Sequence, residues 1–149
     1  MRKTFLHFIA LGLMLSVIFL SSYINQQQPE TWTKDQLLEP SDLAKTMNNP
    51  KEKQPFIICV GPGAVIAGSV NIGPAKDKAN QDKLKAFLSK LHKDASIVIY
   101  CGCCPFDHCP NVRPAFAIIN EMKFTRAKLL NLSHNIKTDW IDKGFPQEK

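Results

Sequence analysis

The sequence has few arginines and no cysteine in its first third. Arginine occurs only as Arg2, Arg113 and Arg126, and the lysines are scattered without interleaved aromatic residues, so we expect a solvated lysine surface and no nucleic-acid partner. The absence of cysteine between Met1 and Phe56 excludes a lipid-modified cysteine at the end of an export signal. The sequence contains no internal repeat, and its 149 residues leave room for one domain with a single core.

The amino-terminal residues 1–22 begin with Arg2 and Lys3, and an apolar stretch follows from Phe5 to Leu20. This pattern is typical of a secretory signal peptide or a short membrane anchor. The stretch is at the short end for a bilayer span and the cleavage pattern after it is poor, so both interpretations stay open. In either case we expect the rest of the chain to be exported, to the periplasm or the extracytoplasmic face of the inner membrane. An uncleaved segment would itself contact the membrane.

Residues 23–31 are polar without periodicity and predict a tether, so we place the folded domain at 32–149. Apolar runs rich in β-branched residues predict strands at 55–60, 67–73, 96–101 and 127–132. Apolar residues at helical spacing predict helices at 41–47, 80–92 and 112–124 and a terminal helical turn at 138–146. Buried strands that alternate with amphipathic helices predict an α/β fold: a small parallel sheet with helices on both faces.

Four of the five cysteines lie at the end of the strand predicted at 96–101 and in the loop that follows it: Cys101, Cys103, Cys104 and Cys109. Ligands of parallel sheets bind beyond the carboxyl ends of the strands, which is where Cys101 lies. A thiol between a strand and a helix faces backbone N–H groups and the positive end of the helix dipole, and both favour the reactive thiolate. Gly102 allows close backbone approach, Asn111 is a plausible N-cap, and Arg113 is a candidate to bind an oxyanion.

The chain from Ser41 to Pro146 resembles the rhodanese family of sulfurtransferases in four segments. SIVIYC resembles the family strand that ends in the catalytic cysteine, and RPAFAIINEMKF resembles the helix after the active loop. AVIAGSVNIG resembles the family's Gly-His-Ile-Pro-Gly-Ala segment, and NLSHNIKTDWIDKGFP resembles its closing loop and Trp-x-x-x-Gly-x-Pro ending. The nucleophile carries over to Cys101, and Arg113 is a looser match to the basic residue that closes the family loop.

This resemblance implies a rhodanese-like domain in which Cys101 takes a sulfane sulfur from a small donor, such as thiosulfate or a persulfide. Cys101 then becomes a persulfide and passes the sulfur to a thiol or protein acceptor, and we expect no resident cofactor. The sequence departs from the family in its longer loop, 102–110, and in two other segments. The family's Asp-Val-Arg strand end reads Cys59, Val60 and Gly61, and the family histidine is replaced by Val65.

The remaining loop cysteines, Cys103, Cys104 and Cys109, admit three interpretations. They can resolve or relay sulfur carried by Cys101, as in thiol-disulfide exchange. With His108 they can bind a soft metal such as copper or zinc. They can also hold a structural disulfide, with Cys104 to Cys109 as the candidate pair. The residue types alone leave all three open.

Several other residues that attract attention are better explained structurally. We expect Cys59 to act as a small buried apolar residue and His134 to be a surface-loop histidine. His92 is expected to close the helix predicted at 80–92, where its charge would complement the dipole. Trp140 and Phe145 are expected in the core.

Overall fold

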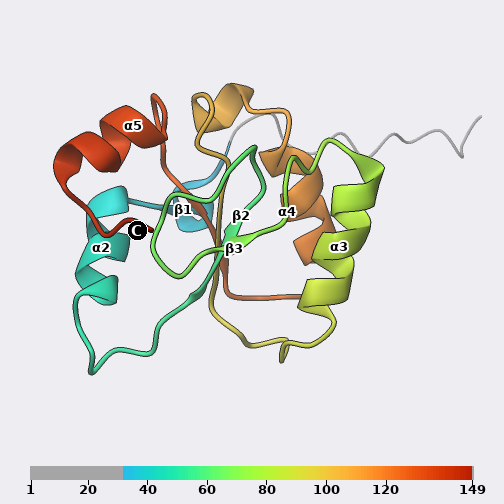
Figure 1. Cartoon of the computed structure of the whole chain (residues 1–149). Coiled ribbons are helices and arrows are strands. Elements are labelled where there is room, and N and C mark those ends of the chain that lie inside the picture. The colour runs from blue at the N-terminus through green and yellow to red at the C-terminus, as the bar shows by residue number, and fades with distance from the viewer. Residues whose placement is uncertain (1–31, 149) are drawn as a thin grey trace, which may run out of the picture. The chain divides into compact units, whose positions relative to one another are not determined.

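The computed structural model describes residues 32–148, which form a five-stranded sheet with helices on either side (Figure 1). The signal peptide or anchor predicted at 1–22 and the tether predicted at 23–31 lie outside the described residues. Within the described part of the chain, no helix has the length and apolar content needed to cross a membrane.

The sheet is parallel throughout, as the sequence predicted. Its strands are β1 (Leu37–Leu38), β2 (Phe56–Cys59), β3 (Val70–Asn71), β4 (Ile97–Tyr100) and β5 (Ala127–Leu130). They lie in the order β1-β5-β4-β2-β3, and every neighbouring pair is parallel. In the central register Ile99 pairs with Ile58 on one side and with Leu129 on the other.

The apolar run of β4 is continuous because both faces of the sheet are buried there, and in β2 only Phe56 is exposed. Along β4, Ile97 and Ile99 enter one hydrophobic cluster, whereas Val98 and Tyr100 enter the cluster on the opposite face. All four are less than 3% exposed. Neither face meets solvent here, so the alternation of apolar and polar residues typical of a half-exposed strand is absent.

The helices cover the two faces of the sheet in pairs. They are α2 (Pro40–Met47), α3 (Lys78–Leu88), α4 (Val112–Glu121) and α5 (Ile136–Asp139), with 3-10 turns η2 (Lys34–Gln36), η3 (Phe106–His108) and η4 (Ile141–Lys143). Figure 1 shows α3 and α4 on one side and α2 and α5 on the other. Leu84 of α3 and Ile119 of α4 pack in the first cluster, and Leu43 of α2 packs with Trp140 in the second. The predicted α/β class, with helices on both faces, is confirmed.

Helix α3 ends earlier than its apolar spacing predicted. The last helical residue is Leu88, and the N–H groups of Lys90 and Leu91 bond to carbonyls three residues back. These bonds tighten the chain into turns, which is a common way for a helix to end. His92 is therefore exposed beyond the helix, and its predicted place within the last helical turn is wrong.

The strand predicted at 67–73 is reduced to the two residues of β3, and a buried side chain binds the backbone that precedes it. The hydroxyl of Tyr100 accepts hydrogen bonds from the N–H groups of Val65, at 2.9 Å, and Ile66, at 3.2 Å. The Ser69 hydroxyl lies 2.9 Å from the same oxygen. Tyr100 is fully buried, so it fixes the 65–69 segment from inside the core.

Trp140 closes the second cluster, in agreement with its predicted core position. The indole is fully buried, and its Nε1 donates to the carbonyl of Pro146 at 2.9 Å. The ring of Phe145 packs edge-on against it, with centroids 5.1 Å apart. The terminal helical turn therefore folds back over the α2 face of the sheet and ends at Gly144, whose φ is 70°.

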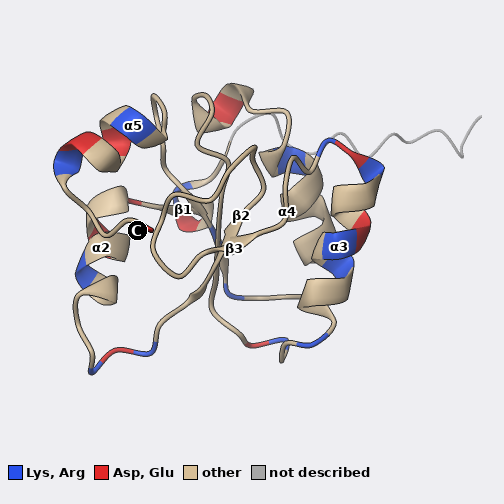
Figure 2. Cartoon of the chain, viewed as in Figure 1, with Lys and Arg blue, Asp and Glu red and all other residues tan. Residues whose placement is uncertain are grey.

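Acidic and basic residues are intermixed along α3 and α5 (Figure 2). Lys78 pairs with Asp82 within α3, and Lys85 reaches Glu121 of α4 at 3.7 Å. These side chains are all at least 47% exposed, so each pair contributes little to stability. The lysines of α3 form the solvated surface that their spacing predicted.

Candidate functional site

The cysteine loop begins where the strand order of the sheet diverges. From the carboxyl end of β4 the chain passes through α4 to β5, whereas from the carboxyl end of its neighbour β2 it passes to β3 on the other side. Open parallel sheets bind ligands at such a switch point, beyond the carboxyl ends of the strands. Cys101 immediately follows β4 and Gly61 lies just after β2, so both are at this position.

Gly61 and Cys101 approach each other so closely that no side chain fits between them. A methyl group added at Gly61 would lie 2.1 Å from the carbonyl oxygen of Cys101 and 2.9 Å from its sulfur. Both distances are far below van der Waals contact, so glycine is required here by the packing. The end of β2 thus forms one wall around the Cys101 thiol.

The Cys101 sulfur is buried among hydrogen-bond donors. The residue is 4% exposed, and the Asn111 side-chain amide donates to Sγ at 3.3 Å from the residue just before α4. The backbone N–H of Cys103 also donates to this sulfur. Donors at a strand end and at a helix start therefore converge on one sulfur atom, which is the arrangement that stabilises a thiolate.

These donors lower the pKa of the Cys101 thiol from 9.0 to about 5. The largest contribution is the hydrogen bond from the Cys109 thiol. Burial of Cys101 opposes this effect, and the donors from Cys103 and Asn111 lower the pKa further. Burial and donation to Cys101 raise the pKa of Cys103 to about 12. Donation to Cys101, and then burial, also raise the pKa of Cys109. At neutral pH the cluster therefore holds one thiolate, on Cys101.

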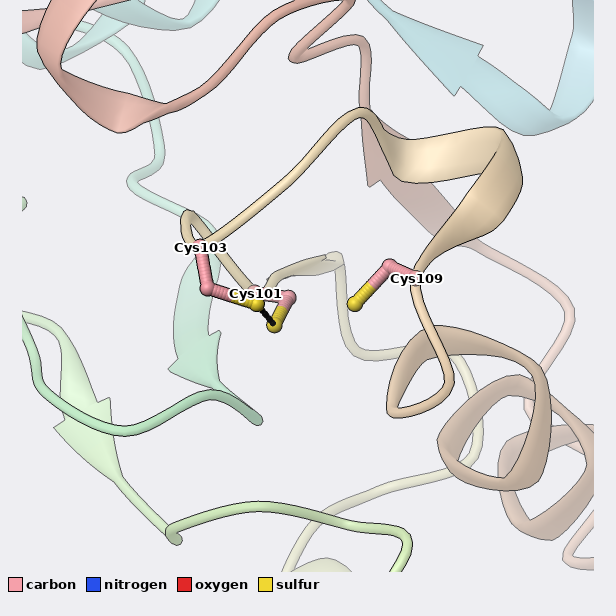
Figure 3. A group of neighbouring side chains, drawn as sticks. All are labelled: Cys101, Cys103 and Cys109. Carbon is pink, nitrogen blue, oxygen red and sulfur yellow. Dashed lines mark hydrogen bonds between the residues drawn. The ribbon is translucent and has the colours of Figure 1, made fainter.

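Three sulfurs converge at the site (Figure 3). The Sγ atoms of Cys101, Cys103 and Cys109 all lie within 4.8 Å of one another, and Cys109 reaches the group from beyond the η3 turn. The Cys101 and Cys103 sulfurs are 3.2 Å apart, and the Cys104 sulfur lies 3.3 Å from that of Cys103. Cys101 and Cys109 are buried, Cys104 is half-buried and Cys103 is exposed.

The segment after β5 forms hydrogen bonds with the backbone of the cysteine loop. Gly102 has a φ of 85°, and its carbonyl accepts a hydrogen bond from the N–H of Ile136 at 3.0 Å. A Cβ at Gly102 would meet the Cβ of Ile136 at 3.0 Å, so glycine serves both the backbone conformation and the contact. Further along, the N–H of Phe106 donates to the carbonyl of Leu132 at 3.0 Å.

Cys59 lies on the other face of the sheet, as a buried residue with no exposed surface. Its thiol donates to the carbonyl of Gly63 at 3.2 Å, and burial raises its pKa. A buried thiol with a raised pKa is a weak nucleophile, which confirms the expectation that Cys59 acts as a small apolar residue.

Three other predicted or weighed residues have contacts outside the cysteine cluster. The guanidinium of Arg113 stacks on Trp32, 5.3 Å from the ring centroid. His108 lies on the η3 turn with its side chain 83% exposed, 3.6 Å from Asp107. His134 is exposed and its Nδ1 lies 3.1 Å from Asp139, which confirms a surface-loop position.

The structure revises two predictions about the loop. The alternative metal set named Cys103, Cys104, His108 and Cys109, but the described residues gather Cys101, Cys103 and Cys109 and leave His108 outside. All five cysteines are free thiols, so the candidate bridge from Cys104 to Cys109 is not formed in this structure.

Asn111 is a further correction and also the residue whose role sequence reasoning missed. It precedes α4 as predicted, but its side chain makes no cap hydrogen bond. Instead it links the Cys101 sulfur to the backbone N–H of Lys76, which donates to Asn111 Oδ1 at 3.1 Å. The only sequence signal is position, because the start of α4 and the end of β4 meet at the same edge of the sheet.

No protein-family model, curated protein or solved structure matches this chain.

Proposed function

We propose that this chain is a rhodanese-like sulfurtransferase that carries sulfane sulfur as a persulfide on Cys101. The observation that carries the proposal is the Cys101 thiolate, buried at the switch point of the sheet with a pKa of about 5. The resemblance of SIVIYC, and of three further segments, to the rhodanese family supports the same residue and the same chemistry.

The reaction needs a nucleophilic thiolate and no redox co-reactant. With thiosulfate as donor, the Cys101 thiolate attacks the outer sulfur, the sulfur-sulfur bond of thiosulfate breaks, and sulfite leaves with the bonding pair. The persulfide anion that remains keeps the single negative charge of the thiolate. The donors from Asn111 and Cys109 are placed to stabilise that charge, and a nucleophilic acceptor then removes the outer sulfur and restores the thiolate.

The test is the intact mass of the full-length chain before and after thiosulfate treatment. The expected result is a gain of one sulfur atom that cyanide removes as thiocyanate, and that is absent from Cys101→Ser. Cys59→Ser is the matched control, because its hydroxyl can keep the bond to Gly63 while a buried thiol is lost. A fully reduced, metal-free chain that gains no sulfur from thiosulfate would contradict transfer from this donor.

A second candidate function, soft-metal binding, is favoured by the three converging sulfurs. Metal–sulfur bonds of about 2.3 Å in a trigonal site require sulfurs about 4 Å apart. The sulfurs of Cys101, Cys103 and Cys109 all lie within 4.8 Å of one another, so small movements would bring them to this spacing. Anaerobic titration with copper(I) against a chromophoric chelator tests this candidate. One tightly bound ion, lost in both Cys103→Ser and Cys109→Ser, would support it, and no competition with the chelator would exclude it.

A further inference from the structure

The cysteine sulfurs form a path from the interior to the surface. Cys101 is 4% exposed, its sulfur is 3.2 Å from that of Cys103, and Cys103 is exposed. The Cys104 sulfur is 3.3 Å from Cys103 and half-buried, so it lies beside this path. Figure 3 shows the Cys101 and Cys103 side chains meeting at their sulfurs.

The burial of Cys101 limits which acceptors can reach a sulfur bound there. Gly61 closes one side, since even a methyl group on it would be 2.9 Å from the Cys101 sulfur. The buried Asn111 amide closes another side at 3.3 Å. A small anion such as cyanide needs little room, whereas a thiol on a folded protein must bring its own backbone to the outer sulfur. Thiol exchange requires that the attacked sulfur be accessible.

We propose that Cys103 takes the sulfane sulfur from the Cys101 persulfide and presents it to a thiol on an acceptor protein. This inference rests on the proposed function, because it needs a persulfide on Cys101. It assigns Cys103 as a relay and names the substrate class on the acceptor side, a protein thiol.

The relay step balances without an oxidant or reductant. The proton of the Cys103 thiol passes to the outer sulfur of the Cys101 persulfide anion, and the Cys103 thiolate then attacks that outer sulfur. The bond between the outer sulfur and Cys101 Sγ breaks, and Cys101 leaves as a thiolate with the bonding pair. One persulfide and one negative charge are present before and after the step, and only their positions have changed.

The surroundings of the two residues favour this direction of attack. The leaving thiolate returns to the Asn111 amide, which donates to the Cys101 sulfur at 3.3 Å, and a stabilised thiolate is the better leaving group in exchange. The Cys103 sulfur already lies within 3.2 Å of the Cys101 sulfur, so the loop needs no large movement. The product carries its outer sulfur on an exposed side chain.

The experiment compares two acceptors of different size on the sulfur-loaded, full-length chain. The small acceptor is cyanide, and the large acceptor is a folded protein with one surface cysteine. For each protein we take the rate of sulfur transfer to the protein thiol relative to its own rate of transfer to cyanide, and we expect Cys103→Ser to lower this ratio at least about tenfold. Cys104→Ser is the matched control, and its ratio should stay within about twofold of that of the unsubstituted chain.

Peptide mapping of the loaded chain gives an independent readout. We expect the added sulfur on both Cys101 and Cys103 in the unsubstituted chain, and on Cys101 alone in Cys103→Ser. Unchanged transfer from Cys103→Ser to the protein thiol would overturn the relay. Release of hydrosulfide with formation of a Cys101–Cys103 disulfide would also overturn it, because Cys103 would then have attacked the inner sulfur. If no variant takes up sulfur, the proposed function itself fails.

Discussion

The Asn111 side chain connects the Cys101 sulfur to the segment that precedes α3. Its Nδ2 donates to Cys101 Sγ at 3.3 Å, and its Oδ1 accepts from the Lys76 backbone N–H at 3.1 Å. Because Asn111 is 4% exposed, both hydrogen bonds are shielded from water. The amide is therefore held by Lys76 in the orientation that stabilises a negative charge on Cys101.

Replacement of Asn111 should raise the pKa of Cys101. Asn111→Ala removes one donor from the thiolate, and Asn111→Asp places a second negative charge beside it, so the increase should be larger for aspartate. The rate of Cys101 alkylation by iodoacetamide, followed by peptide mass as a function of pH, reports this value. In the unsubstituted chain the rate should reach half its maximum near pH 5, following the Cys101 pKa of about 5.

Asn131→Ala is a suitable control for this measurement. It removes an asparagine amide that donates to Glu39 at 2.7 Å and touches no sulfur, so its alkylation profile should match that of the unsubstituted chain. Superimposable profiles for Asn111→Ala and the control would show that the amide does not stabilise the thiolate.

The low pKa of Cys101 also predicts how stability depends on pH. In the folded chain the thiol titrates at about 5, and in the unfolded chain it returns toward 9.0. Between these two pKa values the unfolded state binds more protons than the folded state, so the contribution of Cys101 to stability increases as the pH rises. This contribution is lost as the pH falls through the pKa of the folded state. The raised pKa values of Cys103 and Cys109 change the stability only above pH 9.0, outside this window.

We therefore expect the free energy of unfolding to decrease more from about pH 8 to about pH 6 in the unsubstituted chain than in Cys101→Ser. Urea denaturation under reducing, metal-free conditions measures both slopes, and the difference between the two proteins isolates the thiol from other titrating groups. Parallel slopes would mean that Cys101 is not ionised selectively in the folded state.

The sequence was sufficient to predict the class of fold and most of its elements. The runs FIIC and IVIY became β2 and β4 because all of their residues except Phe56 are buried, and such runs are recognisable without partners. Strand β1 was missed because Leu37 and Leu38 are too few to show periodicity. They form a strand only because they pair with Leu129 and Leu130 of β5.

The candidate site was predictable in its centre and not in its surroundings. Cys101 follows an apolar strand, so its position beyond the sheet could be inferred from local sequence. Its contact with Asn111 depends on how α4 meets β4, and no local pattern encodes that arrangement. His108 illustrates the reverse case. It has a metal-binding side chain among cysteines, but the η3 turn directs it to solvent.

Tyr100→Phe should destabilise the fold although it changes one atom. The hydroxyl accepts hydrogen bonds from the N–H groups of Val65 and Ile66, and its removal leaves these donors without that partner. An unsatisfied buried donor costs about 1–3 kcal/mol, and we expect a loss in this range in urea denaturation. Ser69→Ala removes a neighbour of the hydroxyl but leaves both backbone bonds, so it should cost less. Equal losses of stability in the two variants would indicate that the contact between the Ser69 and Tyr100 hydroxyls, and not the backbone hydrogen bonds, is the main stabilising interaction.

The close approach of β2 and β4 makes Gly61 a sensitive position. A Cβ at Gly61 would be 2.1 Å from the carbonyl oxygen of Cys101, and this oxygen belongs to backbone that cannot rotate away. Gly61→Ala must therefore separate the two strand ends, and we expect overpacking to cost about 1–3 kcal/mol in urea denaturation. The Cys101 sulfur should move with its backbone, so alkylation and sulfur loading of Cys101 should change as well.

Gly63→Ala separates this effect from the general consequence of replacing a loop glycine. Gly63 lies two positions further along the same turn, and a Cβ there meets no atom within 4 Å. Its variant should therefore unfold within about 0.5 kcal/mol of the unsubstituted chain and retain the alkylation profile of Cys101. Similar losses in the two variants would indicate that the turn itself resists substitution. A loss confined to Gly61→Ala would establish the contact with Cys101 as the cause, because the two positions differ in what a methyl group meets.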